Sequence, residues 1–373
     1  MNPQPISPST TTPSLTVLGI ETSCDETAAA VVRWTADGRA KVLSSIVASQ
    51  IAVHAPYGGV VPEIAARAHV EVIDGIIAHA LTAAGVGFDG LDGVAATAGP
   101  GLVGGVMVGL AAGKAIAVAR GLPLMAVNHL EGHAVSARLE APIDYPFLLL
   151  LVSGGHCQLL EVAGVGRCRR LGSTMDDAAG EAFDKIAKAM GLPYPGGPAL
   201  ERLAKGGDTT RYALPRALLG RGGCDFSFSG LKTAAARLAE GVTGPAERRD
   251  LAAAVQAAIA RQLCERSAGA MTRYAERHQG RDLRFVVAGG VAANAEVRRI
   301  LAESARDHGF SFAAPSLVYC TDNAAMIALA GAERLAQGMI DDLDVAARPR
   351  WPLDEAAAVS HPTHVPGRKG AKA

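Results

Sequence analysis

The first 140 residues alternate between short apolar runs and longer segments with helical spacing. Two apolar runs, VLGIE at 17–21 and TAAAVVRW at 27–34, flank the polar turn TSCDE, which predicts paired strands with acidic residues at their turn. Residues 62–84 have apolar positions three and four apart, as in an amphipathic helix. Two further strands are predicted at 92–98 and 123–127. A helix is predicted at 128–139, with Asn128 as its cap.

A similar set of elements begins after residue 140. FLLLLV and CQLLEV flank a Ser-Gly-Gly turn, a helix-rich stretch follows to about Arg277, and RFVVAGG then leads into another helix. We therefore expect two α/β lobes, 15–140 and 141–321, with a return helix at 322–345 that packs on the first lobe. The two ends of the chain have a different composition, which predicts a disordered tail at 1–14 and a loose tail at 346–373.

The composition is that of a packed globular protein, since 49% of the 373 residues are hydrophobic and 19% are charged. The net charge is zero, so a nucleic-acid partner would need a local basic patch, such as an excess of Lys and Arg within 201–237, or a helper protein. That excess is equally typical of an ordinary solvated surface. Six widely spaced cysteines without a C-x-x-C pair predict reduced cytosolic thiols rather than a disulfide or zinc framework.

One uncharged stretch, 94–113, has the length of a membrane span. Gly99, Pro100 and Gly101 interrupt it near its start, which indicates a buried helix instead. The first 14 residues contain no Lys or Arg, which counts against a signal or transit peptide. These features predict a cytoplasmic protein that is not bound to a membrane.

Two histidines four residues apart, His129 and His133, lie in the helix expected at 128–139. Side chains at this spacing share one helix face, so both imidazoles can bind one metal ion, although unrelated surface histidines show the same spacing. Zinc proteases have two histidines at this spacing, but their glutamate directly follows the first histidine. Glu131 lies one place later, which turns its carboxylate away and weakens the protease interpretation.

A carboxylate would complete a two-histidine, one-carboxylate site of the kind that suits iron(II) or zinc. Asp322 is a candidate, since it lies in Thr-Asp-Asn directly before an apolar helical segment. Aspartate is also a favoured N-cap residue, and the local pattern alone favours the cap at this position.

Two glycine turns follow strand-like runs, at 153–155 and 289–290. Such turns can present backbone N–H groups to a phosphate, although most are structural. Asp184 and Asn294 are polar residues that could form hydrogen bonds to a ribose or an adenine. Either residue could equally be a solvated helix residue. The segment GLAAGK, which ends at Lys114, differs from a Walker loop in its glycine spacing and lacks the Ser or Thr, so we reject that motif.

Ten segments in the same order resemble one family, the tRNA adenosine threonylcarbamoyltransferases, earlier known as O-sialoglycoprotein endopeptidases. The matching segments are GIETSCDET (19–27), HAPYGGVVPEIAARAH (54–69), TAGPGLVGG (97–105), HLEGH (129–133), LLVSGGH (150–156), DDAAGEAFDKIAK (176–188), YPGGP (194–198), FSFSGLKT (226–233), VAGGVAAN (287–294) and YCTDNAAMIA (319–328). The resemblance implies an α/β protein with the actin-like ATPase fold, in which a cleft separates two ribonuclease-H-like lobes. It also implies transfer of threonylcarbamoyl from threonylcarbamoyl-AMP to N6 of adenosine 37 in tRNAs that read ANN codons.

The same resemblance implies a set of site residues. His129, His133 and Asp322 would bind one divalent metal, with iron(II) expected and zinc as the alternative. By resemblance, Asp25 and Glu26 lie in the first hairpin turn, where this fold usually faces phosphate. As a separate hypothesis we expect Asp25 to accept the proton of the adenine amine, with Glu26 as the alternative. The residues expected to hold threonylcarbamoyl-AMP are Leu151, Val152, Ser153, Gly154, Gly155, Asp184, Gly197 and Asn294.

The expected partners are tRNA, a paralogous subunit and a small ATPase, all by resemblance. Two alternative functions remain at this point. An actin-like kinase or ATPase would share the lobes, but it would use magnesium, which prefers oxygen ligands to histidine. A non-catalytic paralogous scaffold would be expected to lack the histidine pair, which this chain retains.

Overall fold

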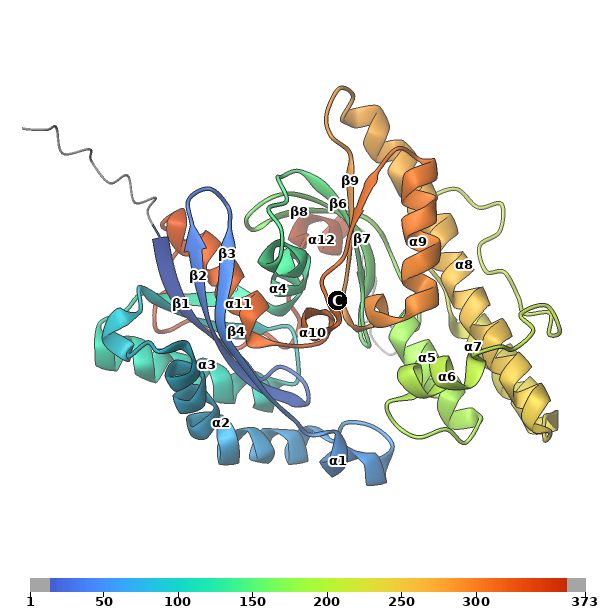
Figure 1. Ribbon diagram of the computed structural model, residues 1–373, viewed down its shortest axis with the longest axis horizontal. Helices are drawn as coiled ribbons and strands as arrows, with labels where there is room; N and C mark the ends of the chain where they lie inside the picture. The colour runs from blue at the N-terminus through green and yellow to red at the C-terminus, as the bar shows by residue number, and fades with distance from the viewer. Residues whose placement is uncertain (1–13, 361–373) are drawn as a thin grey trace, which may run out of the picture.

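The computed structural model describes residues 14–360, which form two lobes that each contain a five-stranded sheet (Figure 1). The first sheet has the order β3-β2-β1-β4-β5. Strands β1 to β3 are antiparallel, and β4 and β5 run parallel to β1. The five strands are β1 Ser14–Glu21, β2 Glu26–Thr35, β3 Ala40–Ser49, β4 Gly93–Gly99 and β5 Leu124–Asn128.

Alternate residues of β1 pack on opposite faces of the first sheet, as the period of a strand requires. Leu18 and Ile20 share a core with α2 (Pro62–Ala84) and α3 (Val103–Arg120). Val17 faces the other layer, which is formed by α11 (Ala324–Ala336). The return helix therefore packs on the first sheet, but it ends at Ala336 and is shorter than the predicted range of 322–345.

The second sheet repeats the topology of the first, with the order β10-β9-β6-β7-β8. Strands β6 to β8 are antiparallel, and β9 and β10 run parallel to β6 and β9 respectively. This repeat confirms the expected fold class of two similar α/β lobes. The five strands are β6 Phe147–Val152, β7 Cys157–Gly164, β8 Arg167–Ser173, β9 Arg284–Ala288 and β10 Ser311–Ala313.

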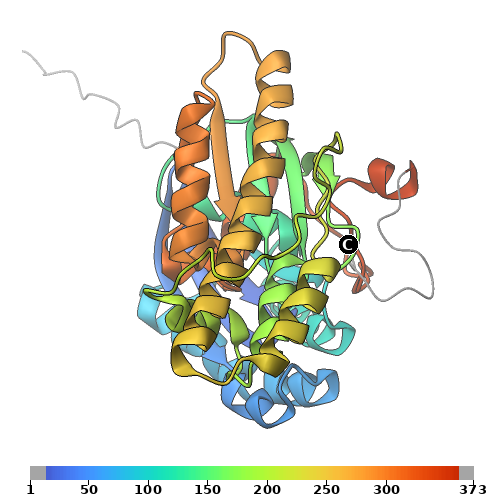
Figure 2. The same cartoon turned by 90° about the vertical axis from the view of Figure 1, so that its right-hand side faces the viewer.

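Helices cover both faces of the second sheet. One face shares its core with several helices, of which α8 and α9 lie in front of the sheet in Figure 2. The opposite face packs on Leu130 and Ala134 of α4 (His129–Val135). Helix α4 therefore lies between the lobes. The helices of the first group are α5 Ala179–Ala189, α6 Gly196–Ala204, α7 Ser229–Gly241, α8 Pro245–Arg277 and α9 Ala295–Asp307.

Three strands were missed by the sequence prediction, for physical reasons that differ. β8 has the sequence RCRRLGS and lies at the edge of its sheet, where charged side chains reach solvent and replace the apolar alternation. β10 is also an edge strand, and it has three residues. β3 has two adjacent serines at its centre, which interrupt its apolar pattern.

The predicted loose tail from residue 346 is wrong for 346–360, because this segment makes backbone hydrogen bonds to the first lobe. The Arg348 amide donates to Ala98 O at 2.7 Å, and the Gly101 amide donates to Pro349 O at 3.3 Å. The chain then reaches the second lobe, where the Arg170 amide donates to Asp354 Oδ2 at 2.8 Å. It ends in α12, Glu355–Ser360. The rest of the predicted tails, 1–13 and 361–373, lies outside the described residues.

Helix α3 (Val103–Arg120) is long and apolar enough, by length and composition alone, to cross a membrane. Its buried residues, which include Val106 and Leu110, face the first lobe, and Leu110 belongs to the core shared with α2. Other side chains, such as Met107 and Val118, are exposed. The predicted burial of this helix therefore holds for one of its faces.

Candidate metal site and interlobe cleft

The two histidines are presented by α4, which follows β5 without a loop. The Leu130 amide donates to Asn128 Oδ1 at 2.9 Å, so Asn128 caps this helix as predicted. Both His129 and His133 are buried, and their ring centroids lie 4.7 Å apart. The helix therefore brings the two imidazoles together in a protected position.

Asp322 lies directly opposite the histidine pair. Its Oδ1 is 3.1 Å from His133 Nε2 and 3.5 Å from His129 Nε2. One ligand atom from each of the three residues falls within a group no wider than 4.8 Å. The predicted metal ligands thus come together, with both histidines offering Nε2.

Asp322 is not the N-cap that the local sequence pattern favoured. The cap of α11 is Asn323, whose Oδ1 accepts from the Met326 amide at 3.0 Å. One residue caps the helix, and the preceding carboxylate is left to face the histidines. That interpretation of Asp322 was wrong because asparagine and aspartate are both good caps, and local sequence does not rank two adjacent candidates.

A buried carboxylate, Glu21, lies behind His129 and was missed by the sequence prediction. Its Oε2 is 2.9 Å from His129 Nδ1 and accepts from the Thr97 hydroxyl at 2.6 Å. Its Oε1 accepts from the Ser23 amide at 2.5 Å. The only indication in the sequence is a charged residue at the end of the buried strand VLGIE, next to the turn that holds Asp25.

The charges of the cluster shift the pKa values of its members. Burial lowers the pKa of His129, but the carboxylates of Glu21 and Asp322 outweigh it and raise that pKa to about 9. For Asp322 burial acts to raise the pKa, but the neighbouring His129 and His133 outweigh it and lower the pKa. Two imidazoles and one carboxylate suit iron(II) and zinc, so the donor set fits the expected metal.

A cavity of about 310 Å³ extends from Asp322 between the lobes. Several of the predicted substrate and catalytic residues line it. The predicted residues on its wall are Asp25, Glu26, Ser153, Gly154, Asp184, Gly197, Asn294 and Asp322. Leu151, Val152 and Gly155 are not part of this wall. Leu151 and Val152 are fully buried in β6, where they support the turn that carries Ser153.

Two of the polar residues on the cavity wall also make internal contacts. Asp184 Oδ1 accepts from the Gly196 amide at 2.8 Å and from the Gly197 amide at 3.2 Å. Asn294 caps α9 through its Oδ1, and its Nδ2 donates to Gln256 Oε1 at 3.0 Å. Both side chains therefore help to shape the wall of the cavity.

The first hairpin turn contributes two acids to the same cavity. Burial and then the charges of Asp322 and Asp25 raise the pKa of Glu26 to about 10, so this carboxyl holds its proton at neutral pH. The Tyr194 hydroxyl, which sequence reasoning missed, lies 3.5 Å from Asp25 Oδ2.

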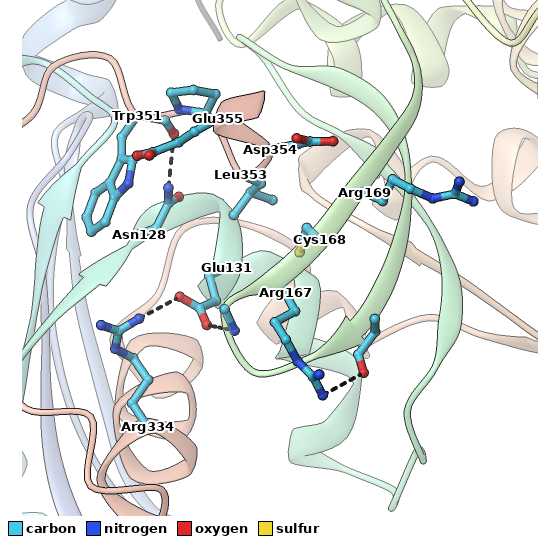
Figure 3. A pocket seen from close by; sticks show the side chains of 13 residues that line it. Asn128, Glu131, Arg167, Cys168, Arg169, Arg334, Trp351, Leu353, Asp354 and Glu355 are labelled. Carbon is cyan, nitrogen blue, oxygen red and sulfur yellow. Dashed lines mark hydrogen bonds and ion pairs between the residues drawn. The ribbon is translucent and has the colours of Figure 1, made fainter. Parts of the chain in front are cut away.

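Glu131 lines a second cavity of about 560 Å³, whose wall includes none of the three predicted metal ligands (Figure 3). Its Oε1 accepts from the Gly166 amide at 2.8 Å, and its Oε2 lies 3.4 Å from Arg334 Nη1. These contacts join α4 to the β7–β8 turn and to α11. The carboxylate is therefore engaged with these partners and is not a member of the histidine cluster, which argues against the zinc-protease interpretation.

The fold and the site together define an actin-like protein with a two-histidine, one-carboxylate cluster beside its interlobe cleft. Among solved structures, HypF from T. kodakarensis shares this fold with a TM-score of 0.55 and 16% identity, over 87% of this chain and 49% of that chain. A full-length HypF in the phosphate- and nucleotide-bound form gives a TM-score of 0.53 over 88% of this chain and 47% of that chain, at 13% identity. These similarities confirm the actin-like fold.

The chain belongs to the tRNA N6-adenosine threonylcarbamoyltransferase family, whose model matches residues 41–329. The protein of that name from Caulobacter vibrioides is 75% identical over 96% of this chain and 98% of its own length. The one from Maricaulis maris is 58% identical over the full length of both chains. The resemblance is confirmed, and the protein is an enzyme of the transferase class.

Proposed function

We propose that this enzyme transfers the threonylcarbamoyl group of threonylcarbamoyl-AMP to N6 of adenosine 37 in tRNAs that read ANN codons, and releases AMP. The observation that carries the proposal is the position of Asp322. It lies beside both histidine Nε2 atoms and also lines the interlobe cavity. A ligand in this cavity can therefore reach the metal cluster and both lobes at once.

His129, His133 and Asp322 would hold one divalent metal, with iron(II) as our assignment and zinc as the alternative. When bound, the metal would supply Lewis-acid chemistry to the carbamoyl group. The neutral form of each imidazole is the one that binds a metal. His129 must therefore give up the proton that the neighbouring carboxylates favour.

The remaining chemistry falls to residues of the cavity. The N6 amine of adenine is a poor nucleophile, because its lone pair is delocalised into the ring. As N6 attacks the carbamoyl carbon, the bond from that carbon to the phosphate oxygen breaks, and AMP leaves with the electron pair. We assign Asp25 to receive the amine proton, since Glu26 already holds one. The backbone N–H of Gly154 would stabilise the phosphate, since the Ser153 amide already donates to His156 O at 2.8 Å.

The partners in this proposal are tRNA, a paralogous subunit and a small ATPase, in the cytoplasm. The chain has equal numbers of acidic and basic residues, 36 of each. A neutral surface attracts RNA weakly, because most nonspecific affinity for nucleic acid comes from neutralised phosphates. Help from other subunits in holding tRNA is consistent with this balance.

The test is transfer of labelled threonine from threonylcarbamoyl-AMP to unmodified tRNA with an ANN-reading anticodon, with and without the candidate partners. We expect transfer by the parent enzyme and loss of transfer in His129→Ala. Asp25→Asn should slow the single-turnover rate by about 100-fold or more, as for a removed general base. No transfer by the parent with any partner combination would refute the proposal and leave the kinase or scaffold function.

A further inference from the structure

The most completely enclosed charged group near the metal cluster is one that the proposed mechanism does not use. Glu21 ends β1 and has no exposed surface. Its carboxylate contacts three separate parts of the first lobe, namely α4 through His129, β4 through Thr97, and the hairpin turn through Ser23. A buried carboxylate with three donors is held in a fixed orientation.

We propose that Glu21 is a positioning residue that fixes His129 with its Nε2 toward the metal and joins this ligand to the turn at 22–25. The inference rests on the metal site of the proposed function. A carboxylate can only accept hydrogen bonds, so the 2.9 Å contact requires the proton of His129 on Nδ1. The lone pair of a neutral imidazole is then on Nε2, which faces Asp322 at 3.5 Å.

The two histidines differ in this respect. His133 Nδ1 is buried and has no hydrogen-bond partner within residues 14–360. Its ring is placed by packing and by Asp322, whose Oδ1 is 3.1 Å from Nε2. Glu21 therefore orients one of the two imidazoles, and loss of its carboxylate should affect the metal through His129 alone.

Ser23 offers a second acceptor for the same proton, since its Oγ lies 3.1 Å from His129 Nδ1. The carboxylate contact is shorter and carries a charge, so it is the stronger of the two. Glu21 also accepts from the Ser23 amide, which begins the turn that holds Asp25. A change at Glu21 therefore reaches both the metal ligand and the turn of the proposed proton acceptor.

The test is metal affinity, measured with zinc by competition against a chelator, without tRNA or threonylcarbamoyl-AMP. Glu21→Gln keeps the size of the side chain, but it removes the charge and turns one acceptor oxygen into an NH2 donor. We expect zinc binding 10- to 100-fold weaker than in the parent, as is typical when a partner of a ligand histidine is lost. The visible spectrum of the cobalt-loaded protein should change as well, since it reports ligand geometry.

Glu333→Gln is the matched control, since Glu333 is also a buried carboxylate, held by Arg138 and Tyr145. It contacts none of the ligands, so this variant should lose stability and still bind zinc within about twofold of the parent. Ser23→Ala should also bind zinc within about twofold, because the carboxylate rather than the hydroxyl is the acceptor. Both expectations follow from the hydrogen bond between Glu21 and the His129 ring, which neither control variant removes.

Folded Glu21→Gln with zinc affinity and a cobalt spectrum equal to the parent would overturn the inference, as would an equal loss in Glu333→Gln. If Glu21→Gln does not fold, Glu21→Asp takes its place, since its shorter side chain withdraws the carboxylate from His129 Nδ1. The same loss of zinc affinity is then expected, and unchanged affinity would overturn the inference. A parent protein that binds no metal would instead refute the metal site of the proposed function.

Discussion

Gly19 of β1 packs tightly against α11, the helix that follows Asp322. A Cβ at Gly19 would overlap the carbonyl oxygen of Ala324 and lie 2.6 Å from the amide nitrogen of Ala328. Both are backbone atoms, so no side-chain rotation can make room. Ordinary non-bonded contacts need about 3.5 Å, so α11 would have to move by roughly 1 Å in Gly19→Ala. Asp322 lies two residues before Ala324 and should move with it.

We expect Gly19→Ala to lower the free energy of unfolding by about 1–3 kcal/mol, the usual cost of overpacking a buried site. It should also weaken zinc binding, because the carboxylate of Asp322 leaves the histidine pair. The assays are thermal unfolding without metal and zinc competition against a chelator. Gly75→Ala is the control, since a Cβ there meets open space in α2, and it should stabilise the protein by about 0.5–1 kcal/mol. Gly19→Ala with the stability and zinc affinity of the parent would refute the reasoning.

Three further predictions follow from the site and from the C-terminal segment. Asp322→Asn should abolish zinc binding and leave the cap of α11 in place. Asn323→Ala should instead lower the free energy of unfolding of the metal-free protein by about 1 kcal/mol, measured by thermal unfolding. If the two variants had equal effects on zinc binding and on stability, their separate roles would be contradicted. The pKa of His129 is raised to about 9, so below that pH a bound metal must displace a proton from this side chain. Zinc affinity should therefore increase as the pH is raised from 6 to 8, by up to about tenfold per pH unit. Affinity independent of pH would contradict this. A chain that ends at residue 345 should melt at a lower temperature than one that ends at residue 360, because it lacks the hydrogen bonds of 346–360 to both lobes; equal melting temperatures would contradict that packing.

The sequence predicts the elements of the lobes well where local pattern and tertiary role agree. The helix predicted at 62–84 has those bounds in the structure. The histidine spacing at 129 and 133 is also a local signal, since one turn of α4 brings both rings to one face. Strand β8 was missed because its position at the edge of the sheet, which its arginines suit, is a tertiary property.

Other parts of the site depend on contacts between distant segments. His133 and Asp322 are 189 residues apart. The residue pattern offered Asp322 as a candidate ligand but favoured a helix cap, and the family resemblance then assigned it to the metal site. Glu21 could not be assigned from sequence, because its role depends on His129 and Thr97 reaching it from other elements. The packing of 346–360 was missed for the same reason, since its partners are backbone atoms of the first lobe and of β8.

The central claim, that the metal held by His129, His133 and Asp322 is required for transfer to tRNA, is tested most directly by varying metal occupancy. The enzyme is stripped with a chelator, reloaded in steps, and assayed at each step for single-turnover transfer of labelled threonine with its partners present. We predict almost no transfer by the stripped enzyme and a rate that recovers in proportion to occupancy. Transfer at the full rate by a fully stripped enzyme would contradict the account.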